Sequence, residues 1–535
     1  MRMKIFLVPV VFVITAAACA TSNSPIEEGE FTLSPETPVT ITGGQIQGVL
    51  SNNNPDIIAF QGVPFAAPPV GNLRWKPPEP VSSWTGIRDA SSPGPMCPQV
   101  GRPNQPQSED CLFLNVWTPI NRSEPLPVMV WIHGGGYRLG AGSGTDGSPL
   151  ASRGVVLVSI NYRLNVFGFL AHPGLSAESE HSASGNYGLM DMVSALQWVQ
   201  NNIASFGGDP DRVTIFGESA GGGSVMSLMV APQAAGLFHR AIAQSTYVPG
   251  WARGLTDAPP GWEPAEHQGQ WIAESLGATG SSALEVMRSA TTEQIMDAAR
   301  VGSGSVFTRT PPIWAPNIDG WYIPADPLLM HDSGKQHDVP LIAGMTGNEG
   351  SLFRSRLGIN DVAAFKSHVE KHYGSIGDQA LDFYDVSSSD ELNAGIDHLI
   401  HDMIFAGPVR SQVSNHSQKT NKSWLYSFSR IPPTEGGMNW GAHHAAELPY
   451  VFGMMSPPTP WTETDRHVSA TMMSYWTQFA ASGDPNSAGL PEWPPFEPDT
   501  DQFLAFDEEI TVGTGLHRDG AELFSLFEAN QRTEN

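Results

Sequence analysis

One serine of this sequence has the neighbours that nucleophilic chemistry requires. Residues 217–221 read G-E-S-A-G, the single G-x-S-x-G pattern of the chain. The pattern follows an apolar, β-branched run at 212–216 and precedes small residues, which is the strand–turn–helix setting of a nucleophile elbow. Glycine is expected on both sides of the serine, because a side chain there would collide with adjoining strand or helix backbone. The sequence therefore predicts that Ser219 is a nucleophile at a helix N-terminus, whose dipole favours negative charge.

A second glycine-rich segment is suited to stabilising a developing negative charge. Residues 133–136 read H-G-G-G and directly follow the apolar run 126–132. Consecutive glycines leave backbone N–H groups uncovered, and such groups can point at the oxygen of a tetrahedral intermediate. Gly135 and Gly136, together with the N–H of Ala220 just after the serine, are predicted to form an oxyanion hole. One such donor is typically worth ~10²–10³ in turnover.

The elements that must position these groups indicate a wound α/β sheet. Several short, β-branched apolar runs are typical of strands buried on both faces of a parallel sheet. Between two of them, apolar residues recur with helical spacing over residues 188–202. This alternation predicts a large, mostly parallel mixed sheet flanked by helices. The expected strands cover residues 126–132, 154–162, 212–216, 339–343 and 423–428.

The chain is expected to hold one catalytic domain, over residues 38–530. Residues 21–37 are rich in Ser, Pro, Thr and Glu without periodicity, and they predict a flexible leader. From about residue 249 to about residue 335, Gly, Pro and helix-like pieces increase. This stretch is expected to form a cap-like excursion over the edge of the sheet rather than a separate domain.

The N-terminus has the pattern of an export signal. A positively charged start precedes an apolar run over residues 5–18, which is too short for a good membrane span. Residues 1–20 are therefore predicted to be a signal peptide. Two processing routes remain open: cleavage at an A-x-A site around Cys19, which we favour, or lipidation of Cys19 as in a bacterial lipoprotein. The mature chain is expected to be periplasmic or secreted, or a lipoprotein of the cell envelope, with no transmembrane span.

Composition argues against nucleic acid as a partner. The formal net charge is −26, so the surface offers no basic footprint for nucleic acid or anionic membranes. The three cysteines include Cys19, whose loss or lipidation would leave an even pair. Export would permit a disulfide between Cys97 and Cys111, the alternative being two free thiols.

Beyond these patterns, the chain resembles the type-B carboxylesterases, the family that includes the cholinesterases. The likeness runs from about residue 38 to about residue 510, and it implies an α/β-hydrolase fold with helical excursions around an active-site gorge. It is carried by residues 60–69 (FQGVPFAAPP), 108–116 (SEDCLFLNV), 185–198, 206–210 (FGGDP) and 216–222 (FGESAGG).

The resemblance implies the other two members of a catalytic triad. Residues 347–350 (GNEG) resemble the family loop that carries the acid, and residues 443–453 resemble its histidine segment. The register H-x-x-E-L followed by V-F-G assigns the general base to His444. The implied triad is Ser219, Glu349 and His444, in which the carboxylate holds the imidazole in the correct tautomer. The chain order Ser, Glu, His agrees with that of α/β-hydrolases.

The same resemblance implies supporting contacts around the triad. Glu218 and Ser245 are expected beside the reacting groups, and Cys97 and Cys111 match the first disulfide of the family. The sequence departs from the family pattern at Thr246, where a glycine is usual, and at Gly222, where an alanine is common. The implied structural ion pairs are Arg74 with Glu109 and Arg163 with Asp191.

The implied activity is hydrolysis of small carboxylic esters through an acyl-enzyme, without a cofactor. The neighbouring histidines 443 and 444 could suggest metal ligands, but adjacent side chains point apart and no HExxH motif is present, so no metal is expected. Two alternatives remain. One is a non-catalytic adhesion module, although such relatives lose the serine. The other is a lipase- or amidase-type acyl hydrolase, because specificity lies in pocket shape rather than in the triad.

Overall fold

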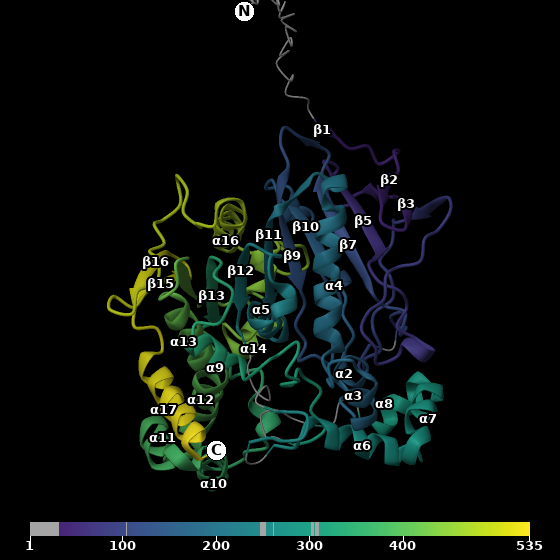
Figure 1. Ribbon diagram of the computed structural model, residues 1–535. Helices are drawn as coiled ribbons and strands as arrows, with labels where there is room; N and C mark the ends of the chain where they lie inside the picture. The colour runs from purple at the N-terminus through teal and green to yellow at the C-terminus, as the bar shows by residue number, and fades with distance from the viewer. Residues whose placement is uncertain are drawn as a thin grey trace, which may run out of the picture.

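The computed structural model describes residues 31–102, 104–246, 253–259, 262–300, 304 and 310–534 (Figure 1). The predicted signal peptide, and residues 21–30 of the predicted leader, lie outside the described residues. Within the described ranges, no helix is both long and apolar enough to cross a membrane.

An 11-stranded sheet forms the centre of the protein, in the order β16-β15-β14-β13-β12-β11-β9-β10-β7-β5-β4. Neighbouring strands from β10 across to β15 are parallel, and the pairs at both edges are antiparallel. The predicted mostly parallel mixed sheet is confirmed. The strands are β4 (Val49–Leu50), β5 (Ile57–Pro64), β7 (Phe113–Pro119), β9 (Leu126–Ile132), β10 (Val156–Ile160), β11 (Gly208–Glu218), β12 (Arg240–Gln244), β13 (Leu341–Thr346), β14 (Ser423–Phe428), β15 (Gln502–Phe506) and β16 (Ile510–Thr514).

Helices cover both faces of the sheet. The side chains of β9 show why each face needs a covering layer. Val128, Val130 and Ile132 belong to a core that also contains residues of α4 (Tyr187–Asn202) and α5 (Ala220–Val230). The intervening Met129 and Trp131 belong to a second core, shared with α16 (Glu463–Ser482). Because successive side chains of a strand point to opposite faces, an uninterrupted apolar run requires an apolar layer on each side.

The described residues between β12 and β13 include four α-helices. Three of them, α6 (Ala265–Ser275), α7 (Ala283–Ser289) and α8 (Thr292–Ala298), lie together at one end of the molecule, close to α3 (Pro173–Glu178) (Figure 1). The fourth, α9 (Pro327–Asp332), packs near α13 (Gly407–His416), which also contacts the C-terminal helix α17 (Arg518–Glu534). Before α13, the chain forms α12 (Ser389–Ile400) and then a π-helical segment, His401–Ala406.

Covalent and ionic contacts hold the loops around the sheet. Cys97 and Cys111 form a disulfide with Cα atoms 5.0 Å apart. The two expected ion pairs are both present and buried, each with a closest N–O distance of 2.7 Å: Arg74 with Glu109, and Arg163 with Asp191.

Candidate active site

Ser219 occupies the turn between β11 and α5, with φ 58° and ψ −121°. This conformation is strained for a residue with a side chain, and neighbouring glycines make it accessible. A Cβ on Gly217 would lie 2.5 Å from the carbonyl carbon of Gly221, and a Cβ on Gly221 would lie 2.0 Å from the carbonyl oxygen of Ile132. Backbone atoms cannot rotate away, so only glycine fits at either position. The steric reason that the sequence suggested for the two glycines therefore holds.

The candidate groups come from loops at one edge of the sheet. The serine turn, the glycine loop and Glu349 follow the carboxyl ends of β11, β9 and β13, and parallel strands bring such ends together. His444 lies beyond β14, the neighbour of β13, in the connection between α14 (Glu435–Trp440) and α15 (Leu448–Val451). A parallel bridge between Asn348 and His443 joins the two loops, which places Glu349 beside His444.

Glu349 and His444 form a buried pair. Nδ1 of His444 lies 2.5 Å from Oε2 of Glu349. The other carboxylate oxygen, Oε1, accepts hydrogen bonds from the Ser245 hydroxyl at 2.6 Å and the Thr346 N–H at 2.7 Å. With the Nδ1 hydrogen directed at the carboxylate, a neutral His444 carries its lone pair on Nε2. This arrangement suits a general base held in one tautomer.

The other ring nitrogen of His444 faces the residue before the serine. Nε2 lies 3.0 Å from Oε1 of Glu218, at an angle that makes no hydrogen bond. No hydrogen bond joins the Ser219 hydroxyl to His444 in the part of the chain that the structure describes. Hydrogen bonds of this kind are often long without substrate and close in the complex with it.

The glycine loop passes directly beside Ser219. A Cβ on Gly134 would lie 3.0 Å from Cβ of Ser219. Gly135 and Gly136 have φ of 104° and 62°, a region that favours glycine. Their N–H groups and that of Ala220, in the first turn of α5, donate no hydrogen bond among the described residues. Three backbone donors are thus available next to the serine.

Three buried glutamates dominate the electrostatics around His444. Burial lowers the pKa of His444, but the charges of Glu218 and Glu349 outweigh it and raise the pKa to about 9. Burial raises the pKa of Glu218 to about 8, against the opposing charge of His444. Burial also raises the pKa of Glu447, with the charge of Glu349, to about 7. Groups that interact this strongly titrate as a unit.

Sequence reasoning missed the residues that brace this pair. Nδ1 of His401 accepts a hydrogen bond from the Glu349 N–H at 3.2 Å. Four residues on, in the same π-helical segment, the Phe405 ring centroid lies 4.8 Å from that of His444, and Phe353 packs on the same imidazole at 4.9 Å. π-helical turns occur frequently at functional sites, but no sequence motif marks this one. Glu447 was visible in the sequence as part of the histidine segment, without a role.

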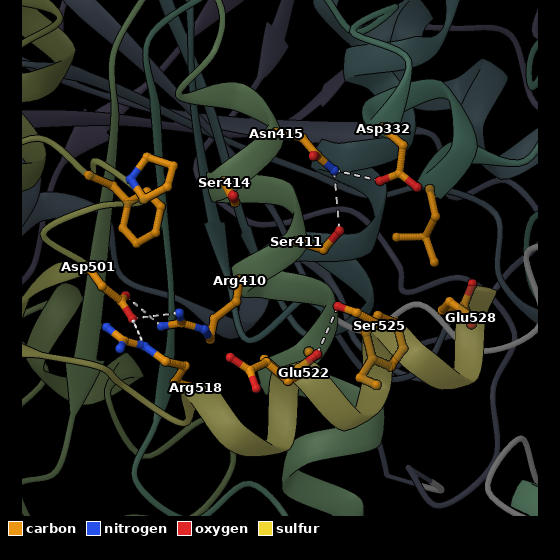
Figure 2. Close-up of a pocket in the computed structure, with 16 residues that line it drawn as sticks. Asp332, Arg410, Ser411, Ser414, Asn415, Asp501, Arg518, Glu522, Ser525 and Glu528 are labelled. Carbon is orange, nitrogen blue, oxygen red and sulfur yellow. Dashed lines mark hydrogen bonds and ion pairs between the residues drawn. The ribbon is translucent and has the colours of Figure 1, made fainter. Parts of the chain in front are cut away.

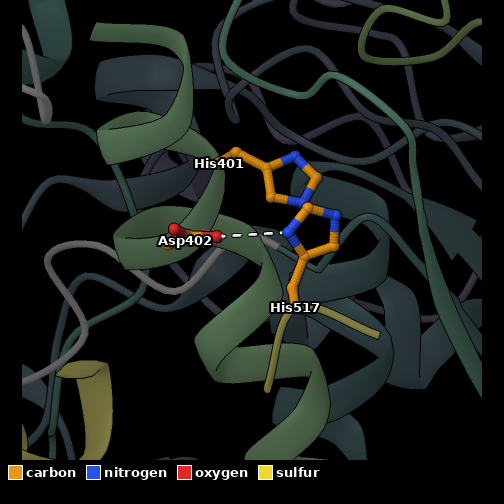
Figure 3. Close-up of side chains that lie close together, drawn as sticks. All are labelled: His401, Asp402 and His517. Carbon is orange, nitrogen blue, oxygen red and sulfur yellow. Dashed lines mark ion pairs between the residues drawn. The ribbon is translucent and has the colours of Figure 1, made fainter. Parts of the chain in front are cut away.

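His401 also belongs to a cluster with Asp402 and His517 (Figure 3), whose side-chain ligand atoms lie within 4.8 Å of one another. Nδ1 of His517 is 3.4 Å from Oδ1 of Asp402, and the two imidazole centroids are 4.0 Å apart. Because Nδ1 of His401 accepts from the Glu349 N–H, its ring hydrogen lies on Nε2. Metal-bound histidines have the opposite arrangement, donating from the nitrogen that does not bind the ion. The cluster therefore does not fit a metal site in this state.

A cavity of about 420 Å³ between α9, α13 and α17 contains none of the predicted site residues (Figure 2). Both of its arginines, Arg410 and Arg518, form ion pairs with the same carboxylate, Asp501. Ion pairs of both arginines with a buried carboxylate are typical of a structural contact, and they indicate no particular ligand.

Comparison with known proteins finds relatives along nearly the whole chain. Residues 35–523 match the family model described as "Carboxylesterase family". The chain is 35% identical to para-nitrobenzyl esterase of Bacillus subtilis over 497 residues, covering 89% of this chain and 95% of that protein. It is 34% identical to fumonisin B1 esterase of Sphingopyxis macrogoltabida over 492 residues, covering 88% and 87%. A solved structure of PNB esterase matches with a TM-score of 0.78 at 33% identity, covering 91% of this chain and 99% of that chain. The predicted α/β-hydrolase fold is confirmed.

Proposed function

We propose that this chain, which belongs to the carboxylesterase family and is a carboxylic ester hydrolase, cleaves its substrates by two-step acyl transfer at Ser219. The observation that carries the proposal is the buried Glu349–His444 pair, whose other ring nitrogen lies 3.0 Å from Oε1 of Glu218, the residue before Ser219. The strained backbone of Ser219 and the three unused N–H groups beside it add support. Nucleophile, base, orienting acid and oxyanion donors are the parts that serine acyl transfer requires.

In the first step, Nε2 of His444 removes the hydroxyl proton as Oγ of Ser219 attacks the ester carbonyl carbon. The carbonyl oxygen becomes an oxyanion and receives hydrogen bonds from the N–H groups of Gly135, Gly136 and Ala220. The intermediate collapses, the C–O bond to the alcohol breaks, and His444 returns the proton to the departing oxygen. An acyl-enzyme on Ser219 remains.

In the second step, His444 takes a proton from water, which attacks the acyl carbon. The oxyanion forms again in the same hole and collapses with loss of the serine oxygen, which recovers its proton from His444. Glu349 accepts the hydrogen bond from Nδ1 and stabilises the imidazolium in both steps. The carboxylic acid product then leaves, and the enzyme is unchanged.

The test is turnover of short para-nitrophenyl esters by the mature chain and two variants. Ser219→Ala should lower kcat by more than about 10⁴-fold, because the nucleophile is lost. Ser227→Ala is a matched control, since Ser227 lies on the same helix and its hydroxyl bonds the Gly223 carbonyl. The control should keep turnover and the same circular dichroism spectrum. Undiminished turnover by Ser219→Ala would refute the proposed nucleophile.

We also propose that the chain is exported. The charged and apolar start of the sequence supports this, and a disulfide is stable in oxidising compartments. Simple secretion is favoured over a lipid anchor at Cys19. The intact mass of the protein recovered from its native host separates cleavage at the A-x-A site, lipidated Cys19 and an unprocessed chain, and the last of these would contradict export.

A further inference from the structure

Arg138 sets a positive charge beside the proposed oxyanion hole. It follows Gly136 by two residues, and its Nε lies 3.9 Å from the position that a Cβ on Gly136 would occupy. Apart from the chain neighbours of Gly136, no other described heavy atom lies within 4 Å of that position. The open side of this glycine is therefore bordered by a guanidinium group.

The backbone holds Arg138 in this place. The Arg138 N–H donates to the carbonyl of Gly135 at 3.1 Å, so the chain turns back on the glycine loop. Tyr137 links the two glycines to Arg138. It has φ 59° and is fully buried, so it anchors the turn in the core. At the far end of the side chain, Nη1 donates to the carbonyl of Gly304 at 3.0 Å.

No carboxylate of the described residues forms an ion pair with Arg138. The internal segments outside the described ranges contain no Asp or Glu: they are residue 103 and residues 247–252, 260–261, 301–303 and 305–309. A guanidinium has five N–H donors in a fixed fork that matches a carboxylate, and one of them bonds Gly304. The half-buried Arg138 thus keeps donors for an anionic group.

The rest of the site makes this charge significant. The groups whose charges act on His444 are the carboxyl groups of Glu218, Glu349 and Glu447, which sets Arg138 apart as a permanently charged cation beside the glycine loop. We propose that Arg138 binds a carboxylate of the substrate, so that the favoured substrates are esters carrying a carboxylate a few bonds from the scissile carbonyl. This inference rests on the proposed function, since Arg138 is placed by its relation to the oxyanion glycines.

The experiment compares charged and neutral esters in matched pairs. On the acyl side, the pair is mono-para-nitrophenyl glutarate and para-nitrophenyl butyrate. On the alcohol side, it is para-acetoxybenzoate and its methyl ester. The wild-type chain should favour the charged member of at least one pair in kcat/KM, and added salt should reduce that preference, because the charge contact is partly exposed. The pair that responds identifies the side of the ester that carries the carboxylate.

Arg138→Met should lower kcat/KM for the favoured charged ester roughly 10- to 100-fold, mainly through KM, and leave the neutral ester within about twofold. Arg138→Lys should recover part of the loss, since it keeps the charge without the planar fork. Arg466→Met is the matched control, because Arg466 is an exposed residue of α16 and its loss changes the net charge equally. The control should leave both rates unchanged.

Different results would contradict the role of Arg138 and the proposed function. Suppose that the wild-type chain hydrolyses neutral esters and that Arg138→Met does not change the ratio of kcat/KM for charged and neutral esters. That result would overturn the role of Arg138 and leave the proposed function standing. An equal fall for both members of a pair would also overturn it. No hydrolysis of any ester by the wild-type chain would contradict the proposed function itself.

Discussion

Nδ1 of His444 lies 2.5 Å from Oε2 of Glu349, and the structure surrounds that carboxylate with donors before any substrate arrives. Ser245 and the Thr346 N–H occupy its other oxygen, and the Glu349 N–H is itself bonded to His401. The acid can therefore neither rotate freely nor leave the histidine. Preorganisation of this kind places the cost of orienting the base in folding rather than in each turnover.

Glu349→Gln tests this pair. Glutamine keeps the shape but has no negative charge to stabilise the imidazolium, and its amide can force the wrong tautomer on His444. We expect kcat to fall by roughly 10³–10⁴-fold with little change in KM. Steady-state kinetics on a short para-nitrophenyl ester measure both quantities. A fall of less than threefold would contradict the role of the carboxylate.

The pH profile should report the glutamates around His444. The base works only when unprotonated, so kcat/KM should rise with pH through the pKa of His444, which is raised to about 9. Glu218→Gln removes a negative charge that favours the imidazolium, so the pKa should fall and the rising limb should move to lower pH. Glu447→Gln should move it in the same direction by less, because the Glu447 charge raises the pKa of His444 less. A limb that stays in place or moves to higher pH in Glu218→Gln would contradict this account.

His401 should matter through one ring nitrogen. In His401→Asn, the amide oxygen can take the place of Nδ1 and accept the Glu349 N–H, whereas in His401→Gln the amide lies near the position of Nε2. We expect the Asn variant to keep most of kcat, and the Gln and Ala variants to lose roughly tenfold. Stopped assays at several pH values, with thermal unfolding as a check on folding, measure the difference. The reverse order of Asn and Gln would show that Nε2 of His401, and not Nδ1, carries the role, and would contradict this account.

Removal of the disulfide should cost stability rather than activity. The two cysteines are 14 residues apart, and in the chain-entropy model closing a loop of this size stabilises by about 3 kcal/mol. The double variant Cys97→Ser, Cys111→Ser should unfold at a lower urea concentration than the oxidised wild type and match the reduced wild type. Equal midpoints for the oxidised wild type and the double variant would show that the bond contributes nothing.

Much of the sheet could be predicted because its signals are local. β9 and β14 have the bounds that their apolar runs predicted, since both strands are buried on both faces. β11 begins four residues earlier than expected, at Gly208, because that residue pairs with Leu126 across an irregular stretch. β13 runs on to Thr346 through Gly344, where a Cβ would lie 2.2 Å from the Tyr426 ring. Strand ends that contain polar residues or glycine lack an apolar pattern, so they cannot be predicted until the neighbouring strand is known.

The residues of the candidate site also differ in whether a local sequence signal marks them. Two glycines close to Ser219 in the sequence mark the serine turn, so Ser219 could be proposed from the sequence alone, although part of the steric need for these glycines comes from the Ile132 carbonyl of β9. Glu349 is a loop carboxylate without a local signal, and only resemblance to a family indicated it. His401 and Arg138 depend on which loops meet in space, through the Glu349 N–H and the Gly304 carbonyl, and no spacing rule joins them.

Covalent labelling tests the central claim most directly. The mature chain is treated with a reactive fluorophosphonate, residual esterase activity is followed, and the modified residue is mapped by peptide mass spectrometry. We predict one adduct per chain on Ser219, formed in proportion to the loss of activity and much more slowly in His444→Ala. A stoichiometric adduct on a different residue, accompanied by full loss of activity, would contradict the assignment of the nucleophile.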